Sequence, residues 1–116
     1  MDFELSADQR LLKKTVRDFA ERELKPNSRA WDEAQQFPRE IFSKLGELGL
    51  LAVVFPEEYG GSGMSTVDYT IVIEELARVD AGVALSTAAH NSLSSGHIFL
   101  AGSEEQKKKY LPKLAT

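Results

Sequence analysis

Cysteine is absent from this sequence of 116 residues, and acidic residues outnumber lysine and arginine. Without cysteine the chain cannot form disulfides, thiolate zinc sites or a cysteine nucleophile. With 14 basic and 18 acidic residues the formal net charge is -4, whereas a nucleic-acid surface normally carries a basic excess. The N-terminus Met-Asp-Phe-Glu-Leu-Ser lacks the apolar core of a signal peptide and the arginines of a transit sequence. We therefore expect a soluble, intracellular protein that binds no nucleic acid.

Charged residues are missing altogether from residues 82–102, which contain no Asp, Glu, Lys or Arg. Such a run belongs in a protein interior, where unpaired charges are costly. Its polar content argues against membrane insertion, because eight of its 21 residues are Ser, Thr, Asn or His. We predict a central helical hairpin, with one helix from 81 to about 94 and a shorter one over 96–101. This hairpin would line either a tight helix interface or a pocket.

The rest of the chain predicts amphipathic helices. Ser6 and Ser103 are each followed three residues later by glutamine, as in a capping box, and Ser65 is followed by an aspartate at the same spacing. Residues 50–55 are apolar, but no partner strand is visible, so we interpret them as a buried connector. The predicted fold is a single all-α domain over residues 1–116, a compact bundle of about five to six helices.

A glycine-rich loop follows over residues 56–63. It lacks the third glycine of a dinucleotide fingerprint, because Thr66 stands at that position, and it lacks the Gly-Lys pair of a P-loop. The run from Gly60 to Met64 approaches a nucleophile elbow, but methionine replaces the final glycine. We interpret the loop as a structural turn whose glycines supply positive φ angles.

Two pairs of ionisable residues are candidates for catalytic or metal-binding groups. His90 and His97 lie seven positions apart without a third ligand at helical spacing, so we predict hydrogen-bonded histidines at helix ends and no metal site. Glu74 and Glu75 are neighbours and point to different sides of a helix, so they cannot form a facing acid–base pair. Solvated or ion-paired roles are favoured for both.

Four residues in the charge-free run share a helical face by their spacing: Leu85, Ala89, Ser92 and Gly96. They become smaller toward one end, as expected for a slot that holds an apolar, flexible ligand such as an acyl chain. A row of small residues would equally well receive a neighbouring helix. The pattern by itself leaves both alternatives open.

Six segments together carry a family resemblance: SADQR (6–10), VRDFA (16–20), LGELGL (45–50), PEEYGGSG (56–63), HNSL (90–93) and GSEEQKKKYLP (102–112). In combination and in their relative places they resemble the N-terminal domain of acyl-CoA dehydrogenases, over essentially the whole chain. The resemblance implies a larger enzyme with an N-terminal helical, a middle β and a C-terminal four-helix domain, assembled as a homotetramer. Such enzymes use FAD to oxidise acyl-CoA to trans-2-enoyl-CoA and pass electrons to an electron-transferring flavoprotein.

The resemblance also implies what this chain contributes. The family's catalytic glutamate and most of its flavin contacts lie in the other domains, so no catalytic residue is assigned here and FAD is not expected to bind this domain alone. The helices that correspond to residues 82–102 form part of the wall around the acyl tail, to which we assign Leu85, Ala89, Ser92 and Gly96. Because Leu85 is large, a short or medium straight chain is expected.

Two classes of function follow. In the first, the chain is the N-terminal part of an acyl-CoA dehydrogenase and is inactive without the remaining domains, in a bacterial cytoplasm or, as a processed chain, in the mitochondrial matrix. In the second, it is a stand-alone binding or assembly module whose 82–102 face engages another protein. The end of the chain at a family domain boundary favours the first.

Overall fold

The computed structural model describes residues 2–116 and contains helices without any strand in that range. The elements are α1 (Ala7–Phe19), a π-helical segment (Ala20–Leu24), α2 (Ser28–Ala34), α3 (Arg39–Glu47), a 3-10 turn (Glu57–Tyr59), α4 (Thr66–Ala77), α5 (Ala81–Ala88), a second π-helical segment (Ala89–Ser95), α6 (Gly96–Ala101) and α7 (Glu104–Leu114). The predicted all-α bundle is confirmed. The molecule is flattened, with principal extents of 41 × 40 × 21 Å.

Local capping starts three of these helices at the expected residues. Ser6, Ser65 and Ser103 each accept a hydrogen bond from the backbone amide three residues later, and the side chain at that position bonds back to the serine amide. These capping boxes satisfy amides that have no partner within the helix. The boxes of α1 and α4 are also joined, because Gln9 Nε2 donates a 3.1 Å hydrogen bond to Asp68 Oδ1.

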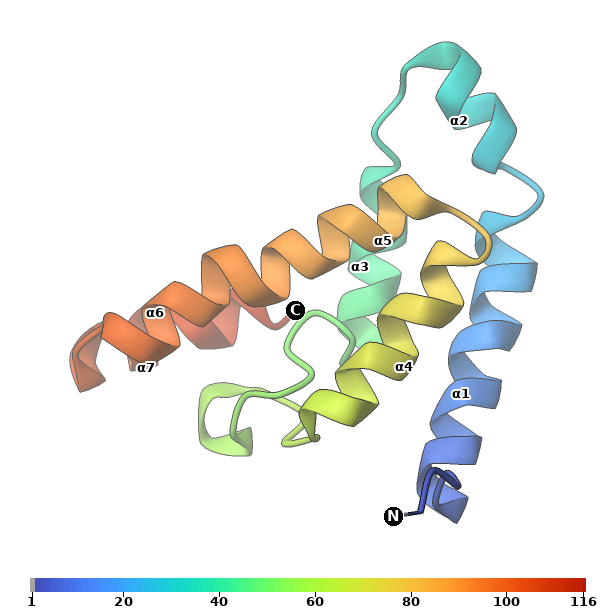
Figure 1. The fold of residues 1–116 in the computed structure, drawn as a ribbon. Helices are drawn as coiled ribbons and strands as arrows, with labels where there is room; N and C mark the ends of the chain where they lie inside the picture. Colours follow the sequence, from blue (N-terminus) through green and yellow to red (C-terminus); the bar gives the residue numbers. More distant parts are fainter. Residues whose placement is uncertain (1) are drawn as a thin grey trace.

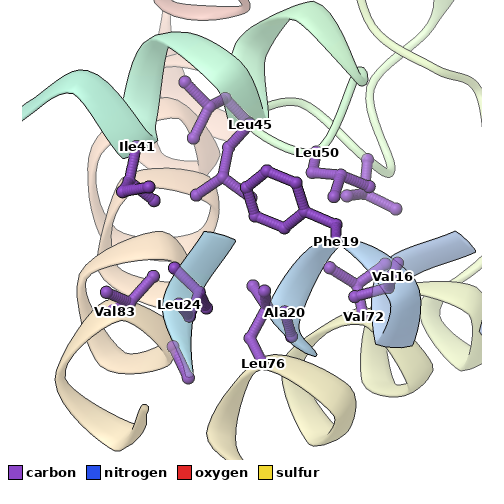
Figure 2. Close-up of a cluster of buried hydrophobic side chains, with 13 residues drawn as sticks. Val16, Phe19, Ala20, Leu24, Ile41, Leu45, Leu50, Val72, Leu76 and Val83 are labelled. Atoms are coloured by element: carbon purple, nitrogen blue, oxygen red, sulfur yellow. The ribbon is translucent and has the colours of Figure 1, made fainter. Parts of the chain in front are cut away.

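The main core lies where α1, α3, α4 and α5 meet. Helices α1 and α4 run side by side, and α5 packs across α4 (Figure 1). Figure 2 shows Phe19 from α1 between Leu45 of α3 and Leu50 of the following segment. The buried cluster consists of Val16, Phe19, Ala20, Leu24, Ile41, Leu45, Leu50, Leu51, Val53, Val72, Leu76, Val83 and Ala84.

The predicted hairpin over residues 82–102 is wrong. The structure has one continuous helical rod, α5, the second π segment and α6, which crosses the molecule in orange in Figure 1. At the junctions Ala89 (φ -61, ψ -41) and Gly96 (φ -59, ψ -43) both keep right-handed helical angles. Glycine tolerates a turn but does not require one, and the run contains no proline, so nothing breaks the helix before Gly102.

The segment over residues 50–55 is a buried, non-strand connector, as predicted, and the glycine loop folds back on it. Ser62, Gly63 and Met64 donate backbone hydrogen bonds of 2.9 Å to carbonyls of the connector. Gly60 and Gly63 have positive φ angles of 84° and 63°. The interpretation of the loop as a structural turn is confirmed.

Candidate functional site

The four residues assigned from the sequence lie along the continuous rod. Leu85 is 72% exposed, Ser92 is exposed, and Ala89 and Gly96 are half-buried. Ser92 Oγ lies 2.9 Å from the hydroxyl of Tyr69 on α4, which also donates a 3.3 Å hydrogen bond to the Ala88 carbonyl. The rod therefore presents an outer surface at Leu85, while Tyr69 ties its middle to α4.

The π segment changes which side chains share that outer surface. A π turn takes up more residues than an α turn, so residues beyond it are displaced around the axis from an α-helical register. The large side chains left open beyond Ala89 are Leu93, 64% exposed, and Leu100, 83% exposed. The sequence analysis did not single out Leu93, because α-helical spacing from Leu85 leads to Ser92.

The inner side of the rod is buried and polar at its centre. Asn91 and Ser95 are the buried residues of the π segment, each 2% exposed. The Asn91 side chain donates hydrogen bonds of 3.1 Å and 3.0 Å to the carbonyls of Leu50 and Thr87, and its Oδ1 accepts one of 3.1 Å from the Val53 amide. The rod is thereby bonded to the connector beneath it.

Neither of two grooves on the surface includes the four assigned residues. One, of about 890 Å³, lies between α2, the loop before α3 and the first turn of α5, with Trp31, Phe37 and Phe42 among its lining. The other, of about 410 Å³, lies between α6 and α7 and includes Ile98 and Tyr110. Of the assigned residues, Leu85 and Ser92 are exposed, and Ala89 and Gly96 are half-buried, so a second surface opposite Leu85 is required to form a pocket.

Both histidines are hydrogen-bonded and Glu75 is ion-paired, as predicted, but the histidines do not lie at helix ends. His90 Nε2 lies 2.6 Å from the Leu114 carbonyl, and His97 Nδ1 bonds to the Leu93 carbonyl. Both histidines lie within the continuous rod, so their predicted placement at helix ends is wrong. Glu75 is ion-paired, as expected: Arg17 donates to both of its carboxylate oxygens, at 2.9 and 3.0 Å.

The glycine loop does not fit the pyrophosphate of a flavin dinucleotide. A phosphate cradle needs free backbone amides that point at the anion. Here the amides of residues 60–64 all donate to carbonyls of the same loop or of the connector. Residues 60–64, which include all three glycines of the loop, therefore offer no free amide to a phosphate, and we derive no flavin chemistry from them.

A buried tyrosine, Tyr59 of the 3-10 turn within the glycine-rich loop, joins this loop to α7. The Tyr59 hydroxyl donates a 2.7 Å hydrogen bond to Glu104 Oε2. This bond, followed by burial, raises the pKa of Tyr59 from 10.0 to about 12. The same bond is the main reason why the pKa of Glu104 is lowered from 4.5.

The pair predicts a pH-dependent contribution to stability. A lowered carboxyl pKa stabilises the folded state above the unfolded value of 4.5, and a raised phenol pKa does so below the unfolded value of 10.0. The contribution is lost as the pH falls through the lowered pKa of Glu104, or rises through about 12. In thermal unfolding, Tyr59→Phe should lower Tm by a constant amount between about pH 6 and 9, with a smaller difference outside that window. A difference that persists unchanged in acid would contradict this assignment.

Comparison with known proteins places the fold in a defined class. The chain is similar to butyryl-CoA dehydrogenase from Megasphaera elsdenii, with a TM-score of 0.92 and 37% identity over 99% of this chain and 31% of that one. It also matches a chain in the structure of the electron transferring flavoprotein of Acidaminococcus fermentans, with a TM-score of 0.95 and 41% identity over 99% of this chain and 30% of that one. The class is that of helical domains found in acyl-CoA dehydrogenases.

The family model for the N-terminal domain of acyl-CoA dehydrogenase matches residues 6–116. A probable acyl-CoA dehydrogenase of Bacillus subtilis, YngJ, is 41% identical over 116 residues, which are 100% of this chain and 30% of that protein. The chain therefore belongs to the acyl-CoA dehydrogenase family, as its N-terminal domain. It spans less than a third of the length of these relatives. Within residues 2–116, no helix is both long and apolar enough to traverse a bilayer.

Proposed function

We propose that this chain is the N-terminal domain of an FAD-dependent dehydrogenase that oxidises an acyl-CoA to the trans-2-enoyl-CoA, and that the rod α5 to α6 forms part of the wall around the acyl tail. The observation that carries the proposal is the open face of a helix without charged residues over 82–102. Its exposed aliphatic side chains are Leu85, Leu93 and Leu100. An uncharged, aliphatic wall suits a ligand that has no polar group to satisfy.

The 116 residues alone should be inactive. The one buried carboxylate, within the described residues, is Glu75, and it is held by Arg17 and further approached by Lys13 and Arg78. A base so engaged is not free to remove a substrate proton. We therefore assign the catalytic base and the flavin contacts to the remaining domains, in a homotetramer that passes electrons to an electron-transferring flavoprotein. The proposed compartment is the bacterial cytoplasm, with the mitochondrial matrix as the alternative.

The first test compares the complete gene product with the 116-residue chain. The complete protein is expected to show a flavin absorption spectrum and to oxidise straight-chain acyl-CoAs with an electron-transferring flavoprotein as acceptor. The 116-residue chain should be colourless and inert toward the same substrates. If the complete protein is colourless and oxidises no acyl-CoA, the proposal is wrong. That result would favour a binding module that uses the same open face.

Leu85 should limit the depth of the pocket. In the complete enzyme, Leu85→Ala removes a large exposed side chain and should shift kcat/KM toward longer acyl chains by about tenfold, the scale of one or two methylenes in an apolar pocket. The measurement is kcat/KM for butyryl-, hexanoyl- and octanoyl-CoA. Leu11→Ala serves as the control, because Leu11 is also an exposed leucine but lies on α1. It should leave the chain-length preference unchanged. An unaltered preference in Leu85→Ala would remove Leu85 from the wall.

A further inference from the structure

We propose that Asn91 is a positioning residue for the acyl-chain wall: it holds the π segment in register and so keeps Leu93 on the open face of the rod. The inference rests on the proposed function for its effect on substrate, but the geometry it invokes is independent of that function. Asn91 lies on the buried side of the rod and does not belong to the open face itself.

The side chain of Asn91 uses both amide hydrogens and its carbonyl oxygen. It bonds to Leu50, Val53 and Thr87, at distances of 3.0 to 3.1 Å. Two of these bonds reach the connector, whose own position is set by hydrogen bonds from the glycine loop. Asn91 therefore fixes the rotation of the rod against a part of the fold that is itself held in place.

A π segment needs such a support, because the α-helix is the usual state of a continuous helical run and π turns are rare. The other buried residue of this segment, Ser95, does not supply it, since its Oγ has no hydrogen-bond partner among the described residues. Thr87 lies just before the segment and bonds within the helix, to the Val83 carbonyl at 2.8 Å. Of these three buried polar side chains, Asn91 makes the bonds that leave the rod.

Relaxation of the segment to an α-helix would rotate the residues beyond it. From Leu85, an α-helical register leads to Ser92. In the structure Ser92 and Leu93 are both exposed, but the Ser92 hydroxyl lies 2.9 Å from that of Tyr69 on α4, so Leu93 is the large side chain left open there. Loss of the Asn91 bonds should therefore exchange a leucine for a serine on the wall. A wall with a smaller side chain accepts a longer acyl tail.

The variant Asn91→Leu keeps the number and branching of the side-chain heavy atoms and removes the three hydrogen bonds. Thr87→Val is the matched control, because it removes a buried hydrogen bond from the same rod but leaves the contacts of Asn91 intact. Asn91→Ser, which retains a hydroxyl, serves if the leucine variant does not fold. Each is made in the complete enzyme and measured by kcat/KM for butyryl- and octanoyl-CoA, by Tm, and by crystallography of residues 89–95.

The expected result is a change of about tenfold in the octanoyl to butyryl ratio for the Asn91 variant, with the π segment replaced by α-helix, against less than about twofold for Thr87→Val. An Asn91 variant that retains the π segment overturns the proposal, as does one whose ratio follows Thr87→Val at a similar fall in Tm. If the wild-type enzyme oxidises no acyl-CoA, the proposed function fails, and the crystal structure alone decides whether Asn91 sets the register.

Discussion

Gly61→Ala should lower the free energy of unfolding by about 3 kcal/mol, because the new methyl group would clash with a backbone carbonyl group. A Cβ at residue 61 would lie 2.0 Å from the Phe55 carbonyl oxygen and 2.4 Å from its carbon. Gly61 does not have a positive φ, so the requirement for glycine here is close approach of two backbone segments. The strain cannot be relieved by a side-chain rotation, since the atoms struck belong to the main chain.

The loss of packing caused by Gly61→Ala should extend from the loop to α6. Phe55 is buried in a small cluster with Ala52 and Ala115, and its ring packs edge-on against Phe99 at 5.4 Å between centroids. Chemical denaturation of Gly61→Ala measures the loss. Gly82→Ala is the control, because residue 82 is exposed in the first turn of α5, and its stability should stay within about 1 kcal/mol of wild type. Equal stability of the two variants would show that the loop can move away from Phe55.

Glu75→Gln should have the second largest effect, a loss of about 2 kcal/mol in the free energy of unfolding. Glu75 is 2% exposed on α4, and Arg17 on α1 donates to both of its oxygens. Glutamine keeps the shape but has one oxygen and no charge, so one donor of the Arg17 guanidinium faces an amide nitrogen. The expected loss is set below that of a fully buried pair because the Arg17 side chain is 47% exposed and water can solvate it.

The adjacent Glu74 provides a control at the same charge change. It is exposed on the outer side of α4, so Glu74→Gln should alter stability by no more than about 0.5 kcal/mol. Urea denaturation of both variants and wild type, at neutral pH and low salt, compares them directly. A loss in Glu75→Gln no greater than that in Glu74→Gln would mean that the α1 to α4 contact is maintained by its apolar residues alone.

Much of the fold could be predicted because the signals lie within a few residues of one another. The capping boxes at Ser6 and Ser103 join a serine to a glutamine three positions away, and the structure has both. The glycines of the loop predicted a turn, and Gly60 and Gly63 have left-handed backbone angles in the structure. Helical periodicity was sufficient to separate the buried and solvated sides of α1, where Val16 and Phe19 are buried.

The candidate site was predicted less completely, because a register within a helix depends on distant contacts. The sequence placed Leu85, Ala89, Ser92 and Gly96 on one helical face, and their assignment to an acyl pocket stays a prediction; in the structure Leu85 is exposed. The sequence could not indicate the π segment, since that segment is supported by bonds from Asn91 to residues 38 and 41 positions earlier. As a result α-helical spacing from Leu85 led to Ser92 and passed over the exposed Leu93.

By itself, then, the sequence determined the helical class, the starts of the capped helices, the charge-free run over residues 82–102 and the family, all of which depend on local pattern or on the order of short motifs. Only the tertiary structure decided that residues 81–101 form one rod, that Glu75 is buried against Arg17 and that the loop amides are already bonded. These features arise from pairs such as Arg17 and Glu75, 58 positions apart. Such contacts form only when the chain is folded, so no local window of the sequence contains them.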